Sequence, residues 1–369
     1  MDKLRWGILG TAQIARKNWQ AILNSGNAIV TALASRDLKR SRRFIADCQS
    51  EAPFRVRPKA FGGYEPLLAS PDVDAVYIPL PTGLRREWVT RAAESGKHVI
   101  CEKPCARNTS ELREMLAVCR RNRVQFMDGV MFVHSRRLDR IRKVLDDGAS
   151  LGQIKRVAAQ FSFRATEKFL HENIRVNNRL EPHGCVGDLG WYCIRFILWA
   201  MKWRLPREVI ARILAQARGA GSPAPVPAEF SAELLFAGGT SAGFYCSFLT
   251  ENQQWANVSG TKGYLHVSDF VLPFHGPQLS FEVYHPVFEL HGCDFEMKPN
   301  RRQFHVAEHG NSHPAAQETN LFRNFSRQVR SGKLNPEWTE AALKTQQVMD
   351  ACMDSAKAGG RAVSVGNTG

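Results

Sequence analysis

Residues 5–15 read RWGILGTAQIA, and this stretch decides the fold of the chain. An apolar run ends at Leu9, and apolar residues then recur with helical spacing as far as Leu23. A glycine turn between a strand and a helix lets the backbone approach a pyrophosphate, and the helix N-terminus offers N–H donors to it. Alanine stands where the second glycine of such loops is usual, which narrows this approach without preventing it. The stretch therefore predicts a dinucleotide-binding loop, with cofactor contacts at Gly10, Thr11, Ala12, Gln13 and Ile14.

The same alternation of strand and helix continues to residue 127. Further strands are expected at residues 28–34, 59–61, 75–78, 98–101 and 124–127, and helices at 38–48, 64–69, 85–95 and 109–122. Strands that alternate with helices predict a parallel sheet with right-handed crossovers. We therefore expect an NAD(P)-binding Rossmann domain over residues 1–130.

The second half of the chain has a different pattern. Strand-like segments dominate it, at residues 154–163, 209–215, 230–236, 240–248, 254–259, 264–267 and 279–284. Helices are expected at 137–146, 188–201, 315–331 and 339–358, and the polar, histidine-rich stretch 285–313 is expected to be a loop. These elements predict a substrate and dimerisation domain over residues 131–369, built on a large, mainly antiparallel open sheet. The fold class is thus α/β plus α+β, with C-terminal helices packing back toward the first domain and a homodimer formed through the open sheet.

The composition excludes several classes of protein. Hydrophobic residues make up 44% of the 369 residues and charged residues 23%, which is ordinary for a globular chain. The nine cysteines form no CxxC pair and no Cys/His cluster with zinc spacing, so we expect no metal and a reducing compartment. The N-terminus has no signal or transit pattern, and no apolar stretch is long enough to span a membrane. We therefore expect a cytoplasmic protein with no membrane partner.

The net charge of +15 leaves acidic partners to consider. A basic surface attracts nucleic acid, a membrane or an acidic small molecule. No nucleic-acid motif with interleaved aromatic residues is present, so we expect a small-molecule substrate and no nucleic-acid partner. The densest basic cluster, Lys39 to Arg43, follows the second expected strand, close to where a cofactor phosphate would bind.

Residues at the end of that strand favour NADP(H) over NAD(H) as the cofactor. NAD enzymes usually place an acid here to hold the ribose 2′-hydroxyl, but this strand runs into Ser35 and Arg36, which suit a 2′-phosphate. Arg40 lies one helical turn later and can join them. Two alternatives stay open: Asp37 keeps NAD possible, and Arg36 could be simply a solvated side chain.

A second motif, Cys101-Glu102-Lys103-Pro104, follows the fifth expected strand. A lysine at the carboxyl end of a parallel strand points into the ligand crevice, and the proline after it restrains the backbone. Near a positive nicotinamide ring, such a lysine would either have a depressed pKa or act as a fixed cation.

With this motif the chain resembles the Gfo/Idh/MocA family of oxidoreductases over nearly its whole length. The resemblance rests on GILGTAQIA at 7–15, ASRD at 34–37, DVDAVYIPLPT at 72–82, GKHVICEKP at 96–104, GDLGWY at 187–192, GTKGYLHV at 260–267 and TQQVMDACMDSA at 345–356. Within the family, the stretches GDLGWYCIR and VMFVH are most similar to the branch of dimeric dihydrodiol dehydrogenase and NADP-dependent D-xylose dehydrogenase, with its uncharacterised plant members.

The resemblance implies a set of site residues. Lys103 matches the lysine that contacts cofactor and substrate, and its peptide bond to the next proline is expected to be cis. Asp188 and Tyr192 match the paired acid and proton donor of the family. Further cofactor contacts are implied at Leu80, Pro81, Thr82 and Glu102, and substrate contacts at Phe132, His134 and Arg175.

The implied reaction is NADP-dependent hydride transfer between nicotinamide C4 and a hydroxyl or carbonyl carbon of a sugar, a diol or a related metabolite. Asp188 and Tyr192 lie four residues apart on one expected helix, so they share a face. Tyr192 would exchange the proton and Lys103 would stabilise the alkoxide. Because an ammonium lies nearby, we expect the pKa of Tyr192 to fall below the value of about 10 for free tyrosine.

Several alternatives stay open. Asp188 could be only a helix cap and Tyr192 only a core residue. The family also allows a redox-neutral reaction, either epimerisation or oxidative glycoside cleavage, and a catalytically silent protein that binds NADP. The chain departs from the family at Arg85, where histidine is frequent, and at Phe132, where tryptophan is common, and these departures leave the substrate open.

Overall fold

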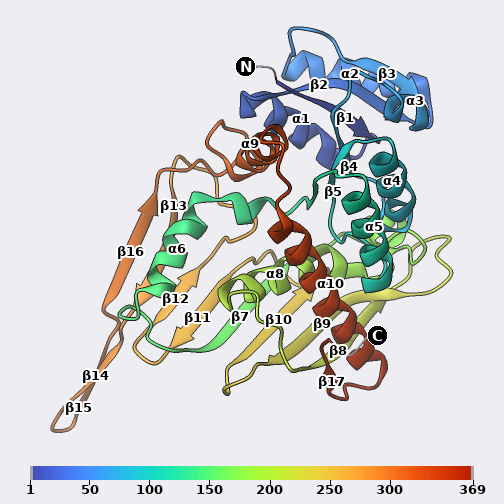
Figure 1. The fold of residues 1–369 in the computed structure, drawn as a ribbon. Coiled ribbons are helices and arrows are strands. Elements are labelled where there is room, and N and C mark those ends of the chain that lie inside the picture. The colour runs from blue at the N-terminus through green and yellow to red at the C-terminus, as the bar shows by residue number, and fades with distance from the viewer. Residues whose placement is uncertain (1–2, 367–369) are drawn as a thin grey trace.

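The computed structural model describes residues 3–366, and its first half is a parallel sheet connected by helices (Figure 1). Six strands lie in the order β3-β2-β1-β4-β5-β6, and their pairings are parallel. The strands are β1 (Leu4–Leu9), β2 (Ala28–Ser35), β3 (Lys59–Gly62), β4 (Ala75–Ile78), β5 (His98–Cys101) and β6 (Phe126–Asp128). The helices are α1 (Gln13–Ser25), α2 (Leu38–Glu51), α3 (Glu65–Leu68), α4 (Thr82–Glu94) and α5 (Thr109–Arg121). The expected Rossmann fold is confirmed.

Continuous apolar runs explain why these strands sit inside the sheet. Trp6, Ile8 and Tyr77 are fully buried, as expected for parallel strands that are covered on both faces. The strand order reverses between β1 and β4, so a ligand crevice opens at the carboxyl ends of these two strands.

The second half of the chain is built on a nine-stranded sheet in the order β16-β13-β12-β11-β7-β10-β9-β8-β17. Its strands are β7 (Ile154–Ser162), β8 (Glu208–Ala217), β9 (Val226–Leu235), β10 (Ser241–Ser247), β11 (Ala256–Gly260), β12 (Tyr264–Val267), β13 (Leu279–Tyr284), β16 (Arg301–Val306) and β17 (Val363–Ser364). Within residues 3–366, β7 and β10 are the one parallel pair of this sheet. The expected mainly antiparallel sheet is therefore confirmed.

Helices cover one face of this sheet and leave the other face open (Figure 1). Along β8, Val209 and Ala211 are buried, whereas Ile210 and Leu214 are exposed. This alternation is typical of a sheet with one packed face. The helices of this half are α6 (Arg136–Asp146), α7 (Glu167–Glu172), α8 (Trp191–Ala200), α9 (Gln317–Arg330) and α10 (Pro336–Lys357). In the part of the chain that the structure describes, none of the helices is long and apolar enough to cross a membrane.

Two C-terminal helices bind the second half of the chain to the first. Just after α1, the Asn27 side chain donates to the carbonyl oxygen of Arg323 on α9 at 3.0 Å. At the start of α5, the backbone N–H of Thr109 donates to the carboxylate of Asp350 on α10 at 2.6 Å. Both sheets are therefore held in one arrangement by side chains far apart in the sequence.

A buried ion pair fixes helix α8 against the first sheet. Arg195 on α8 pairs with Asp128 at the end of β6, and the two side chains are 2% and 3% exposed. The indole N–H of Trp191 donates to the same carboxylate at 3.2 Å, and Arg195 Nε donates to Thr345 Oγ1 at 2.8 Å. This network sets the orientation of α8, which carries Tyr192.

The expectation of a loop over residues 285–313 is wrong. Strands β14 (Val287–His291) and β15 (Asp294–Lys298) form an antiparallel hairpin that extends away from the body, and β16 follows it (Figure 1). Composition hides this pattern, because the stretch is polar and rich in histidine. Apolar and polar residues nevertheless alternate in VFELH and DFEMK on either side of a Gly-Cys turn, which is a hairpin pattern.

We predict that Arg195→Ala lowers the free energy of unfolding by about 3–5 kcal/mol, because it leaves the Asp128 carboxylate buried without its partner charge. Chemical denaturation followed by circular dichroism measures the loss. Arg86→Ala is the matched control, since the ion pair of Arg86 with Glu114 is more than half exposed and such pairs contribute about 0–1 kcal/mol. Equal losses in the two variants would contradict the role given to the buried pair.

Candidate active site

A cavity of about 840 Å³ opens at the carboxyl edge of the first sheet and is bounded on its far side by α8. Its wall combines the first turn of α1, the loops after β4 and β5, and the segment that precedes α8. This is the place expected for a ligand in an open parallel sheet. The volume lies in the range of roughly 300–1,000 Å³ that small-molecule sites occupy.

The turn after β1 presents the backbone of helix α1 to this cavity. Gly10 has a φ of +118°, a conformation that favours glycine, and its N–H donates to the carbonyl oxygen of Ala34 at 2.8 Å. Ala12 is the N-cap of α1 but has no side chain that can accept a hydrogen bond, and the first turn holds no acid. The first turn, where Gln13 and Ile14 line the cavity, is therefore suited to an anionic ligand.

The residues after β2 include two exposed arginines and one engaged acid. The Asp37 carboxylate caps helix α2. Arg36 and Arg40 are exposed. Burial raises the pKa of Tyr64, whereas the positive charges of these two arginines act to lower it. Both guanidinium groups therefore lie near the Tyr64 side chain. The buried Ser35 hydroxyl donates to the Asp37 carbonyl oxygen at 2.6 Å.

A buried arginine organises the loop after β4. Arg85 is 5% exposed, and it donates to the carbonyl oxygen of Leu80 at 2.7 Å and to the Thr82 hydroxyl at 2.9 Å. It also donates to the carbonyl oxygen of Pro104, while the N–H of Thr82 donates to Glu181 at 3.0 Å. Arg85 therefore ties the loop after β4 to the segment after β5, and its Nη2 lies 3.9 Å from the Glu181 carboxylate.

The carboxylate of Glu102 is fixed from two sides. The Tyr77 hydroxyl donates to Glu102 Oε1 at 2.6 Å, and the backbone N–H of Lys103 lies 3.3 Å from Oε2. Burial and the adjacent carboxylate raise the pKa of Tyr77 well above its usual value, so its hydroxyl stays a donor. The peptide bond between Lys103 and Pro104 is cis, as expected.

The carboxylate of Asp188 holds two cations in the cavity. Lys103 Nζ lies 2.9 Å from Asp188 Oδ1 and 2.6 Å from its carbonyl oxygen, and Arg175 Nε lies 2.7 Å from Oδ2. Burial acts to raise the pKa of Asp188, but Arg175 and Lys103 hold it far below its usual range. Asp188 lies within the π-helical turn Val186–Gly190 and not at an N-cap. It is therefore an anion that positions cations.

Tyr192 faces the same cavity with Lys103 over its ring. Lys103 Nζ lies 4.6 Å from the ring centroid, and the hydroxyl donates to Met131 Sδ at 3.8 Å. A thioether is a weak acceptor, so a ligand oxygen can replace it. Burial raises the pKa of Tyr192 well above its usual value, and the charges of Glu102 and Asp188 add to the rise. The expected fall in this pKa is therefore wrong, because burial and the two carboxylates outweigh the positive charge of Arg175.

The cavity separates the sequence-predicted residues into two sets. Those that line it are Ala12, Gln13, Ile14, Leu80, Pro81, Glu102, Lys103, Arg175, Asp188 and Tyr192. Those outside the lining are Gly10, Thr11, Ser35, Arg36, Arg40, Thr82, Phe132 and His134.

Two expected substrate contacts lie behind the cavity wall. Phe132 is fully buried, and its ring centroid lies 6.2 Å from that of Tyr192, which it supports. His134 Nδ1 lies 3.2 Å from the Asn324 side-chain nitrogen, and its ring packs on Trp338. Burial lowers the pKa of His134 to about 4. The turn after β6 directs these rings toward neighbouring helices, so the structure does not support either residue as a substrate contact.

Three residues that the sequence did not identify support the site. Asp128 ends β6 at the same edge of the sheet as Lys103. Its place at the carboxyl end of a parallel strand could have identified it as a site residue from the sequence. Tyr77 acts through Glu102, 25 residues away, and Glu181 acts through Thr82, 99 residues away. A local sequence pattern does not indicate contacts over such separations.

Comparisons with known proteins agree with this arrangement. The family model "Oxidoreductase family, NAD-binding Rossmann fold" matches residues 4–130. The model "GFO/IDH/MocA C-terminal domain" matches residues 138–266.

Individual relatives extend over most of the chain. Trans-1,2-dihydrobenzene-1,2-diol dehydrogenase of Bos taurus is 31% identical over 72% of this chain and 74% of its own length. D-xylose 1-dehydrogenase (NADP(+)) 2 of Haloferax volcanii is 32% identical over 72% of this chain and 76% of its own. The crystal structure of KijD10, a 3-ketoreductase from Actinomadura kijaniata in complex with NADP and TDP-benzene, is 25% identical with a TM-score of 0.77, over 96% of this chain and 98% of that one. The chain belongs to the Gfo/Idh/MocA family of oxidoreductases.

Proposed function

We propose that the protein is an NADP-dependent oxidoreductase that transfers a hydride to or from the oxygen-bearing carbon of a sugar, a diol or a related small metabolite. The observation that carries the proposal is the grouping of Lys103, Asp188 and Tyr192 in one cavity with the first turn of α1. The printed names of the relatives, which include a diol dehydrogenase, a xylose dehydrogenase and a ketoreductase, support this substrate class.

The residues around the cavity fit NADP(H) better than NAD(H). The first turn of α1 carries neither an acid nor a capping side chain and can receive a pyrophosphate. Arg36 and Arg40 form no ion pair with any residue in the range 3–366, so both can turn to a 2′-phosphate. The Asp37 carboxylate, which would hold a free 2′-hydroxyl, is used in capping α2.

In the reduction direction bound NADPH supplies the hydride, and residues of the chain act on the substrate oxygen. Tyr192, kept protonated by its buried position, donates its proton to the carbonyl oxygen. Lys103 stabilises the negative charge that develops on this oxygen. Asp188 holds the ammonium in place, and Arg175 holds Asp188 from the other side.

We also propose that residues 1–130 hold the cofactor, that residues 131–369 supply the substrate contacts, and that two copies associate through the open face of the nine-stranded sheet. That face carries aromatic side chains, which are enriched at protein interfaces. The rings of Tyr264 and Tyr284 stack there with centroids 4.7 Å apart, close to Trp255 and His266.

Two alternatives are separated from this proposal by one assay. NADPH absorbance is followed with sugars and diols in the presence of NADP+ and with ketones in the presence of NADPH, and product is quantified in parallel. An oxidoreductase forms or consumes one NADPH for each product molecule, whereas an epimerase or a glycoside-cleaving enzyme forms product with no net change in NADPH. A silent NADP-binding protein forms no product even at high enzyme concentration.

We predict that the rate of the oxidation reaction depends strongly on pH through Tyr192. Oxidation needs the phenolate, and a raised pKa leaves that form scarce near neutrality. The kcat/KM for NADP-dependent oxidation should therefore rise about tenfold per pH unit from about pH 7 to 9, while reduction, which uses the phenol, stays nearly constant.

The control for this prediction is Tyr192→Phe. The variant should lose most turnover in both directions while it keeps its affinity for NADPH, because the ring and its packing remain. Tryptophan fluorescence measures the affinity, and stopped-flow absorbance measures turnover. Near-normal turnover in Tyr192→Phe would remove the role assigned to the hydroxyl.

We predict that the double variant Arg36→Ala/Arg40→Ala raises the KM for NADPH at least tenfold and leaves the KM for NADH within about twofold. The loss of one charge-assisted hydrogen bond, about 1.5–3 kcal/mol, accounts for the tenfold change. Arg42→Ala is the matched control, since Arg42 is exposed on the same helix but is not assigned to the cofactor. Equal changes with both cofactors would contradict 2′-phosphate binding at these arginines.

A further inference from the structure

The β14–β15 hairpin projects from the edge of the nine-stranded sheet, and its strands pack mainly against each other (Figure 1). It carries four of the most exposed large apolar side chains among residues 3–366. They are 53–71% exposed and comprise Phe288, Leu290, Phe295 and Met297.

These apolar side chains share one face of the hairpin. Phe288 lies opposite Met297 in the pairing register, and Leu290 lies opposite Phe295. Successive side chains of a strand point to opposite faces, so all four belong to the same face. The rings of Phe288 and Phe295 contact each other edge to face, with centroids 5.7 Å apart.

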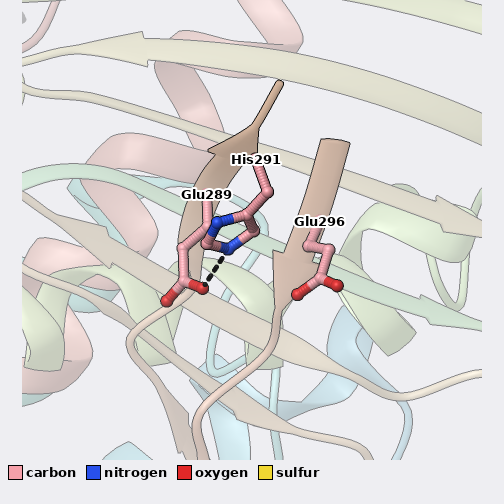
Figure 2. Close-up of side chains that lie close together, drawn as sticks. All are labelled: Glu289, His291 and Glu296. Carbon is pink, nitrogen blue, oxygen red and sulfur yellow. Dashed lines mark hydrogen bonds and ion pairs between the residues drawn. The ribbon is translucent and has the colours of Figure 1, made fainter. Parts of the chain in front are cut away.

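The opposite face is polar and is satisfied by its own ion pairs. Figure 2 shows Glu289 and His291 on one strand and Glu296 on the other. Lys298 Nζ lies 2.5 Å from a Glu289 oxygen and 3.6 Å from a Glu296 oxygen. Lys298 thus bridges the two carboxylates, and the polar face is well suited to water.

An isolated two-stranded hairpin is marginally stable in water, and a third layer against its apolar face is the usual remedy. Contiguous exposed apolar surface on a protein generally marks an interaction site. Within the described residues no element covers this face, which leaves it open to another molecule.

The place of the hairpin in the sheet indicates the side from which another molecule could cover it. Tyr284 pairs with Arg301 in the main sheet, and three residues further along each strand Val287 pairs with Lys298 in the hairpin. The register is therefore the same in both ladders. Glu282 and Tyr284 lie on the open face of β13, and the hairpin follows directly from β13 and β16, the two strands at that edge of the sheet. Residues 285–286 and 299–300, where Asn300 has a φ of +37°, separate the two ladders. The hairpin thus leaves the sheet at the border of its open face.

We propose that the apolar face of the β14–β15 hairpin docks on a second copy of this chain and clasps the partner beyond the edge of the sheet. The inference rests on the proposed homodimer. Charge favours a second copy as the occupant, because the hairpin carries Glu289, Asp294 and Glu296 against one lysine, whereas the chain as a whole has a net charge of +15. A symmetric pair of copies would form this contact twice, which strengthens the association.

The test compares two pairs of substitutions in the full chain by sedimentation equilibrium. Phe288→Ser/Phe295→Ser removes the apolar face and should raise the dissociation constant of the dimer roughly tenfold or more. Glu289→Gln/Glu296→Gln keeps the apolar face and removes two of the acidic charges, so it should weaken the dimer less than the serine pair does, and this smaller effect should disappear at high salt. Thermal melting and NADPH affinity should be unchanged in both, since the hairpin lies outside the body and the cavity.

The outcomes separate the clasp from the homodimer. A wild-type dimer whose dissociation constant is the same in the serine variant overturns the clasp and leaves the homodimer standing. A wild-type protein that is monomeric at high concentration overturns both. Neither result bears on the chemistry at Tyr192, which the activity assay tests.

Cys293 at the hairpin tip gives a second readout. It is exposed, whereas the other eight cysteines are buried, so a maleimide–benzophenone reagent labels this position in the unaltered protein. After irradiation of mixed ¹⁵N-labelled and unlabelled protein, we expect cross-links between light and heavy chains that depend on Phe288 and Phe295. Cross-links confined to single chains would overturn the proposal, and Cys293→Ser controls for labelling elsewhere.

Discussion

The carboxylate of Asp188 is the constraint on which the site depends. It receives Lys103 from the carboxyl edge of the first sheet and Arg175 from the segment that precedes α8. Because these groups belong to different parts of the chain, the cavity keeps its shape only while α8 stays in place. The buried pair of Arg195 with Asp128 holds α8 in place, one helical turn after Tyr192. One ion pair inside the cavity and one behind it thus fix Tyr192 relative to Lys103.

The surroundings of Tyr192 keep its hydroxyl protonated. Burial disfavours the phenolate, and the carboxylates of Glu102 and Asp188 disfavour it further. Lys103 nevertheless lies over the ring and within reach of an oxygen bound beside the hydroxyl. In the proposed reaction, a protonated phenol and a fixed cation at one position suit carbonyl reduction at neutral pH.

Local pattern accounts for what could be predicted from the sequence. The loop at residues 7–15 and the motif at 101–104 each lie between a strand and the next element, where side-chain direction follows from the fold, and both reach the cavity. Long-range packing accounts for the rest. Phe132 and His134 stand beside the cavity in sequence but face neighbouring helices, Arg85 is buried in the wall, and the hairpin at residues 287–298 was hidden by its polar composition.

The central claim is that this cavity transfers a hydride with net consumption of NADPH, and deuterium transfer tests it most directly. NADPH that carries deuterium at both hydrogen positions of nicotinamide C4 is incubated with the enzyme and a panel of sugars, diketones and ketones, and the products are analysed by mass spectrometry. The account predicts one deuterium on the carbinol carbon of the product for each NADPH consumed. Product that forms without deuterium, or tight NADPH binding with no label transferred to any carbonyl compound, would contradict it.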